Sequence, residues 1–447
     1  MTTIVLHALN KLKKYISEKL SSYQVCLRHI VAFTVPDSNE FDLAVCKLVK
    51  RTEKLAIVFQ LDINGPSQRS VTGVNAFGYR RYKWMDWLIT INVLMSVTRF
   101  IVLTFSTSDS VAIYLGDPLF RVEDRQVLLV WFAMAMSIMF IFREWILNLN
   151  AKGRFEILST WKVCCNGFDS SNLQMSNLVA RRFRLTIFLF SIFVHNVMLL
   201  IPFFLSLLLL VCTLSNPWIF KMPKLAFFAF VLGSSSIFVG DFLLAAVIGF
   251  FWYIACSIYF HLFRLYDLLH CAKDLNHRLV GGKQLGSFCV SIIRHLNEFE
   301  AVSHKFRYLL LYYVSIFAAA GDFDIFLGMI VKVYNDFLAN LLTILGFFIL
   351  LSSLAFSLIF GDFISQVNML TVKLHQLSTK SRLTMGSANK VLEVMDRAAG
   401  PYNGIKIGDF VTLEKSFAIS FLLENMSILM LFICNIGPYL GSYKSSA

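Results

Sequence analysis

LTIFLFSIFVHNVMLLIPFFLSLLLLVC, residues 185–212, is a run of 28 residues that contains no Asp, Glu, Lys or Arg. About 20 apolar residues in an α-helix are enough to cross the roughly 30 Å hydrocarbon core of a bilayer. A helix also satisfies every backbone hydrogen bond internally, which lipid requires. The run therefore predicts a membrane-spanning helix.

Six further apolar runs extend this prediction along the whole chain. Together the expected spans lie near 86–105, 127–147, 185–212, 241–263, 308–332, 339–366 and 417–440. The composition agrees, because 57% of the 447 residues are hydrophobic, 44 of them are Phe, and the mean hydropathy is +0.65. The predicted fold class is an all-α membrane protein with seven transmembrane helices.

Lys and Arg are distributed unevenly between alternate loops, and this predicts the orientation. One set of segments holds 33 of them: 1–85, 148–184, 264–307 and 367–416. The other set holds 5: 106–126, 213–240, 333–338 and 441–447. Cytoplasmic loops are the basic ones, so the N-terminus is expected inside and the C-terminus outside. Attraction to anionic membrane lipid explains the net charge of +13, and no nucleic-acid partner is expected.

The spans divide the chain into four parts. Residues 1–85 form a cytoplasmic N-terminal region, with a helix expected near 8–33, and 86–366 carry helices 1–6 with their loops. Residues 367–416 form a cytoplasmic anchor segment, and 417–447 form helix 7 with a short extracellular tail.

Two basic segments have helical character. Apolar residues recur at helical spacing in 264–307 and 367–416, which predicts that helices continue beyond the membrane as a packed intracellular anchor. Residues 224–240 are apolar but interrupted by Gly233 to Ser236, and we interpret them as an outer loop or a short re-entrant piece rather than an eighth span.

The last span carries polar residues on an otherwise apolar helix. Glu424, Ser427 and Asn435 fall close together on a helical wheel. A polar stripe of this kind fits a face that lines water, and carboxylate rings are a common cation-selecting device. The alternative is a buried helix with a few interhelical hydrogen bonds.

Several polar and aromatic residues within the spans are candidates for binding a small ligand. Buried acidic groups are costly in a membrane, so Asp322 and Asp324 each either line a cavity or bond to a neighbouring helix. Aromatic walls with a few polar groups suit a small-molecule site. The other candidates for an outward pocket are Trp131, His195, Asn196, Trp252, Tyr253 and Asn340. For each of these an ordinary interhelical hydrogen bond is the alternative.

Other charged residues and the remaining motifs point to no chemistry. Arg99 and the adjacent pair Arg143 and Glu144 lie near the ends of spans, where snorkelling to the interface is the expected role. No nucleophile–base constellation, phosphate loop or metal-ligand spacing occurs, so neither an enzyme nor a cofactor or metal is expected.

The seven spans, the inside N-terminus and the extended inner segment before the last span resemble the arthropod gustatory/odorant receptor superfamily. The gustatory family carries Thr-Tyr, five apolar residues and Gln-Phe in its last span. The corresponding window here is 424–432, in which Phe432 alone matches and Ser427 interrupts the apolar run. The lead-in Gly408-Asp-Phe-Val-Thr-Leu-Glu414 looks like the one in that family, so the chain resembles a divergent, gustatory-like member.

The resemblance implies a tetrameric, ligand-gated, non-selective cation channel in the plasma membrane of sensory neurons. In that architecture the last span of each subunit lines the pore, and a small tastant binds among spans 2–6 near the outer leaflet. The resemblance is compatible with four identical subunits and with a tetramer of different subunits.

Two other classes of protein share a seven-span pattern. A G-protein-coupled receptor has the opposite orientation, and Asn435-Ile-Gly-Pro-Tyr439 differs from its Asn-Pro-x-x-Tyr motif. A transporter would often show two repeated halves with interrupted helices at matching positions, and the run at 233–236 has no such counterpart.

Overall fold

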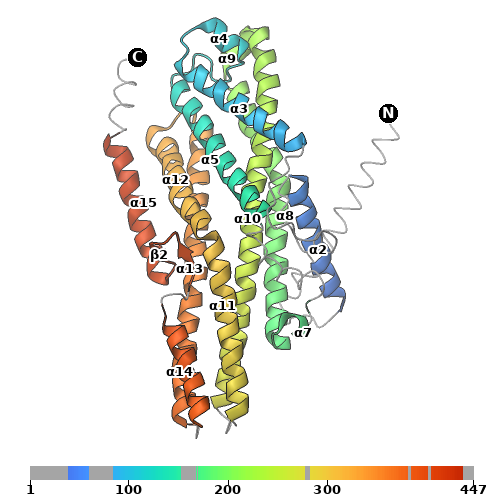
Figure 1. Ribbon diagram of the computed structural model, residues 1–447. Coiled ribbons are helices and arrows are strands. Elements are labelled where there is room, and N and C mark those ends of the chain that lie inside the picture. The colour runs from blue at the N-terminus through green and yellow to red at the C-terminus, as the bar shows by residue number, and fades with distance from the viewer. Residues whose placement is uncertain are drawn as a thin grey trace.

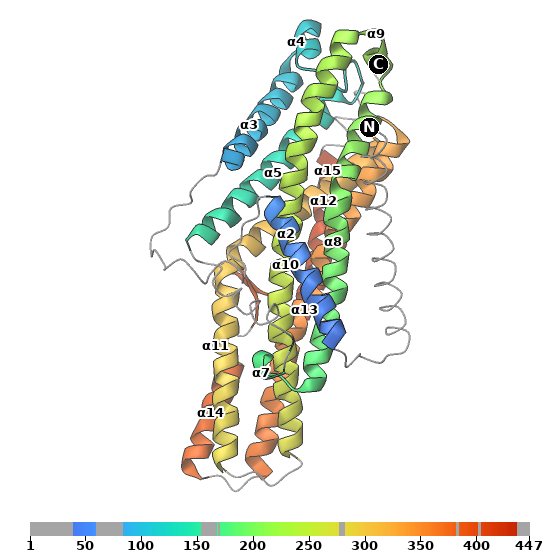
Figure 2. The same cartoon turned by 90° about the vertical axis from the view of Figure 1, so that its right-hand side faces the viewer.

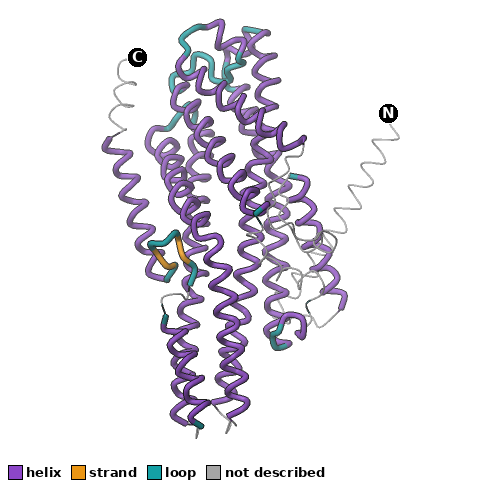
Figure 3. Tube along the Cα trace, viewed as in Figure 1, coloured by secondary structure: helices purple, strands orange, loops and turns teal. Residues whose placement is uncertain are grey.

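The computed structural model describes residues 39–59, 84–152, 168, 170–276, 282–380, 384–400 and 404–435. Nearly all of the described structure is helical, and the long helices run side by side as an elongated bundle (Figure 1). Loops gather at the end that carries α4 and α9, which we call the upper end (Figure 3). The opposite end, which carries α14, is the lower end.

Within the described residues, seven helical segments are long and apolar enough to cross a membrane, which confirms the predicted all-α, seven-span fold. Six of them contain α3 (Trp84–Phe105), α5 (Arg125–Ala151), α8 (Asn177–Leu214), α10 (Pro223–Asn276), α13 (Asp336–Lys380) and α15 (Lys415–Asn435). The fifth in chain order joins α11 (Gly282–Tyr312), the π-helical turn η2 (Tyr313–Phe317), α12 (Ala318–Ile325) and a second π-helical turn η3 (Phe326–Val331). Residues 436–440 of the last predicted span lie outside the described residues.

Shorter elements join these helices. They are α2 (Asn39–Val58), α4 (Asp109–Tyr114), α7 (Ser170–Leu173), α9 (Pro217–Lys221), α14 (Met385–Ala399), β1 (Lys406–Ile407) and β2 (Val411–Thr412). The two strands form one antiparallel hairpin just before α15.

Helix α2 lies along α8, and the sequence analysis did not predict it (Figure 2). Its buried residues Phe41, Val45 and Val49 recur every four positions, which is the helical signal that was available. The helix expected near 8–33 lies outside the described residues.

The interpretation of 224–240 as a loop or re-entrant piece is wrong, because α10 is a continuous helix from Pro223 to Asn276. At 1.5 Å per residue its 54 residues measure about 80 Å, far more than the roughly 30 Å bilayer core. The serines do not break the helix. Ser236 donates to the carbonyl of Leu232 (3.1 Å), and Ser235 donates to Asn92 of α3 (2.8 Å).

The lower end is a packed group of helical extensions. The lower parts of α10, α11 and α13 run together, and α14 packs against α11 and α13 (Figures 1 and 2). Phe299 of α11 stacks on Phe363 of α13 with ring centroids 3.6 Å apart. The predicted extension of helices beyond their apolar parts is therefore present.

Arg143 does not snorkel to an interface, because its side chain is fully buried. Its guanidinium lies 2.8 Å from the Asp86 carboxylate of α3 and 2.7 Å from the Glu144 carboxylate. The flexible side chain of Arg143 thus reaches its sequence neighbour as well as a residue of another helix. The ion pair with Asp86 ties α3 to α5.

Arg99 is likewise buried, and it holds the loop above α3. Its Nε donates to the carbonyl of Leu115 (2.7 Å) and its Nη2 to the carbonyl of Gly116 (2.6 Å). Gly116 has a φ of +59°, and a Cβ there would lie 2.3 Å from the Phe228 backbone of α10. The loop thus presses its backbone against the upper part of α10 at a position that only glycine fits.

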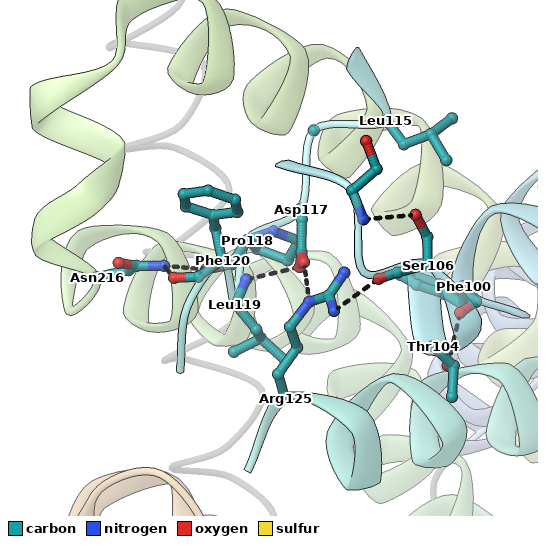
Figure 4. A network of polar contacts seen from close by, with 12 residues as sticks. Phe100, Thr104, Ser106, Leu115, Asp117, Pro118, Leu119, Phe120, Arg125 and Asn216 are labelled. Atoms are coloured by element: carbon teal, nitrogen blue, oxygen red, sulfur yellow. Dashed lines mark hydrogen bonds and ion pairs between the residues drawn. The ribbon is translucent and has the colours of Figure 1, made fainter. Parts of the chain in front are cut away.

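The connection between α3 and α5 is an ordered cap held by polar contacts (Figure 4). Asp117 is fully buried, pairs with Arg125 and accepts a bond from the Leu119 amide (3.0 Å). The amide nitrogen of Asn216 donates to the carbonyls of Pro118 and Phe120, at 3.1 Å each. These bonds join the loop to the α8–α9 connection and close the upper end.

Candidate functional site

The outward face of α15 carries the polar residues predicted to line a pore. Glu424, Ser427 and Asn435 are all exposed among the described residues. Only 17% of the most apolar segment of this helix is buried, and α15 stands at one side of the bundle (Figure 1). Asn425, by contrast, is buried and donates to the carbonyl of Phe421 (2.6 Å).

A groove of about 620 Å³ runs along this face and extends the stripe toward the start of the helix. Besides Glu424 and Ser427, it is lined by Glu414, Ser416 and Ser420. Residues 416, 420 and 424 follow each other at a spacing of four, so they share one helix face. Ser416 and Ser420 were not among the residues predicted from the sequence, although this spacing of four is a usable signal.

The inward face of α15 contacts the fifth span. The ring of Phe432 lies 5.7 Å from Phe323 of α12 and 5.9 Å from Phe326 of η3, measured between centroids. Leu429, Phe432 and Ile433 pack against the apolar cluster at the upper end, which also contains Trp131. One face of α15 is therefore fixed to the bundle while the polar face is open.

Trp131 and Asp324 are brought together across α5 and α12. The indole Nε1 of Trp131 donates to the Asp324 carboxylate, and both side chains are buried. Asp322 is also buried, and its Oδ2 has no hydrogen-bond partner within the described residues. The region thus holds one bonded carboxylate and one incompletely satisfied carboxylate near the upper apolar cluster.

Trp252 and Tyr253 lie elsewhere, in the larger core between α8 and α10. Their rings contact each other at 4.8 Å, and Trp252 Nε1 donates to the hydroxyl of Ser191 (3.1 Å). His195 is buried one helical turn after Ser191, and Asn196 is half-buried.

The predicted ligand residues therefore do not form one continuous group. Trp131 and Asp324 meet at the upper cluster, the α8–α10 set belongs to the main core, and Asn340 is exposed on α13. None of them lines the groove on α15. Within the described residues, no three His, Cys, Asp or Glu side chains lie close enough to hold a metal ion.

Tyr334, which is half-buried, joins the loop before α13 to the same upper region. Its backbone amide donates to the Asp124 carboxylate (2.9 Å) in the connection before α5. Partial burial, followed by the effect of the nearby Cys212 thiol, raises the pKa of Tyr334 to about 12. The bond to Asp124 fastens the loop between η3 and α13 to the start of α5, the helix that carries Trp131.

Comparison with known proteins gives a structural match. No family model and no curated protein matches the sequence. The fold is similar to the structure of the insect olfactory receptor OR5 from Machilis hrabei, with a TM-score of 0.60 and 13% sequence identity. The match covers 87% of this chain and 99% of that chain. The chain therefore has the fold of a solved insect olfactory receptor.

Proposed function

We propose that this chain is a subunit of a chemosensory, ligand-gated cation channel of the gustatory/odorant receptor superfamily, opened by a small extracellular tastant. The observation that carries the proposal is the exposed polar stripe of α15, on a fold similar to that of an insect olfactory receptor. The pore-lining side chains are Glu424, Ser427 and Asn435, joined by Ser416 and Ser420.

The open face of α15 supports assembly into a tetramer. An apolar helix with few internal contacts needs lipid or another subunit against it. Leu422, Leu423, Met426 and Met430 are each at least 46% exposed and flank the polar stripe. Four copies arranged about an axis would cover these side chains and turn the stripe toward a shared aqueous path.

The orientation follows from the charge pattern, with the lower end in the cytoplasm. The helical extensions and residues 367–416 then form an intracellular anchor, and the cap and α9 face outward. The excess of Lys and Arg on the lower side supports this assignment.

The ligand site that best fits the contacts is the region around Trp131, Asp322 and Asp324. A small polar molecule would find an aromatic wall and two carboxylates there. Phe323 lies between these acids in sequence, Phe326 follows Asp324 by two positions, and both rings contact Phe432 of α15. Binding that shifts α12 would therefore act directly on the pore helix.

The test is expression of the full chain alone in cells, with recording of currents against sugars, bitter amines and amino acids. Glu424→Gln should lower cation conductance at low ionic strength, by roughly tenfold where a ring of carboxylates concentrates cations. Glu393→Gln on α14, an exposed carboxylate outside the groove, is the matched control. Unchanged conductance, selectivity and block in Glu424→Gln would remove Glu424 from the pore wall.

A tag on the C-terminus tests the orientation separately. The tag should be reached by antibody on intact cells. An antibody signal that requires permeabilised membranes would contradict the channel topology and favour a G-protein-coupled receptor.

A further inference from the structure

A groove of about 250 Å³ lies between α8 and α10, away from α15 and from the candidate ligand residues. Its apolar wall includes Val179 of α8 with Phe263 and Leu269 of α10. Three basic side chains complete its lining: Arg182 of α8, and His270 and Lys273 of α10. An apolar wall next to basic groups is the arrangement that an amphiphilic anion requires.

Acidic side chains neutralise few of the positive charges at the groove. All three are exposed, and neither Arg182 nor Lys273 forms an ion pair with any described residue. His270 lies 3.8 Å from the Asp274 carboxylate. Asp267, the other nearby acid, accepts a hydrogen bond from Ser176. His270 and Lys273 are three positions apart, so both point from one face of α10 toward the groove beside Arg182.

The groove lies at the level of the membrane where lipid headgroups are found. Arg182 stands three residues before the apolar run that begins at Leu185, and His270 stands seven residues after the run that ends at Phe263. The groove therefore lies where α8 and α10 leave the hydrocarbon on the lower side. Anionic lipids are concentrated in the cytoplasmic leaflet, and basic pockets between spans on that side bind their headgroups.

We propose that this groove binds an anionic phospholipid of the inner leaflet, with the headgroup phosphate between Arg182 and Lys273 and an acyl chain along Phe263. The proposal rests on the proposed orientation, which makes the lower side cytoplasmic. A phosphorylated headgroup fits better than a carboxylate alone, because the cations come from two helices and can bind several oxygens of one phosphate.

Tyr266 connects the groove to the pore helix. Its ring lines the groove, and its hydroxyl donates to the Asp362 carboxylate of α13. The other oxygen of Asp362 lies 2.9 Å from Nζ of Lys415, the first residue of α15. A lipid that holds Tyr266 in place would thus stabilise the start of α15 through two polar contacts.

The test measures lipid binding to the purified full chain in detergent by native mass spectrometry, which does not depend on any current. The probes are short-chain phosphatidylinositol bisphosphate, phosphatidylserine, phosphatidylcholine and free inositol trisphosphate. We expect the bisphosphate lipid to bind tightest. The double variant Arg182→Gln/Lys273→Gln should weaken it on the order of 30-fold.

The control variant Arg294→Gln/Lys305→Gln removes two charges from α11 on the same side but outside the groove, and it should bind as the natural chain does. Arg182→Lys/Lys273→Arg keeps the charges and should retain binding, which covers the case in which the glutamine variant fails to fold. Equal binding of phosphatidylcholine, or unchanged affinity of a folded glutamine variant, would overturn the proposal. Free inositol trisphosphate that binds as tightly as the lipid would also overturn it, since the acyl chain would then contribute nothing.

Discussion

Helices α10 and α15 have similar mean hydropathy in their most apolar segments, yet 67% of that segment is buried in α10 and only 17% in α15. Helix α10 is surrounded by α3, α5, α8 and α13, whereas the main contacts of α15 within the described residues are with the fifth span and α13. Apolar composition therefore identifies both as membrane helices but does not distinguish them. The arrangement makes α10 the centre of the bundle and leaves one face of α15 uncovered by the described residues.

The largest expected effect comes from truncating the core of α10. Trp252 is fully buried, so Trp252→Ala should lower the free energy of unfolding by about 3–5 kcal/mol. Leu423→Ala on α15, where the side chain is 65% exposed, should change it by about 0.5 kcal/mol or less in the dissociated subunit. Denaturant titration of detergent-solubilised protein measures both. Equal losses would mean that α15 is as much a part of the subunit core as α10.

The cap over α10 gives the next largest effect. Gly116→Ala places a Cβ against the Phe228 backbone at a φ of +59°, and should cost about 2–3 kcal/mol through the left-handed backbone and the displaced loop. Gly286→Ala on α11 is the matched control. It has no atom within 4 Å of the added Cβ, and should stabilise the helix by up to about 1 kcal/mol. A cap that tolerates alanine at 116 without loss of stability would show that the upper part of α10 does not depend on this contact.

The sequence predicts the seven spans because each apolar run exceeds the thickness of the bilayer. It fails where distant contacts decide the structure. Helix α10 continues through Gly233 because the missing side chain admits Leu209 of α8, whose atoms would lie 2.9 Å from a Cβ there. The burial of Arg143 depends on Asp86, which is 57 positions away and has no local signal.

The candidate site, like the fold, is predictable from the sequence only where the signal is local. The polar stripe repeats locally, so three of its residues could be identified from the sequence, while Ser416 precedes the expected start of the span. The pairing of Trp131 with Asp324 joins residues 193 positions apart, and helical periodicity contains no information about it.

Contact between α15 and the fifth span is tested by Phe432→Ala. The variant removes a ring that packs on Phe323 and Phe326, and should weaken coupling between ligand and pore by about 0.5–2 kcal/mol. The half-maximal agonist concentration should then shift about 2- to 30-fold, because each 1.4 kcal/mol is a factor of ten. Leu431 is adjacent in sequence and its side chain is 57% exposed, so Leu431→Ala should leave the half-maximal agonist concentration unchanged. Identical dose responses for both variants would place the coupling route elsewhere.

The smallest effect tests a polar route that joins α10 to α15 through Asp362 of α13. Tyr266→Phe deletes the hydrogen bond to Asp362 but keeps the ring, and Asp362 retains its contact with Lys415. Removing this hydrogen bond should cost about 1 kcal/mol of free energy, the contribution that is typical of a single side-chain hydrogen bond. Tyr259→Phe, also on α10, has no hydroxyl partner within the described residues and serves as the control. If Tyr266→Phe changes the current at a fixed agonist concentration while Tyr259→Phe does not, the buried helix acts on the exposed one through Asp362. If the two variants behave alike, the hydrogen bond from Tyr266 to Asp362 does not couple α10 to α15.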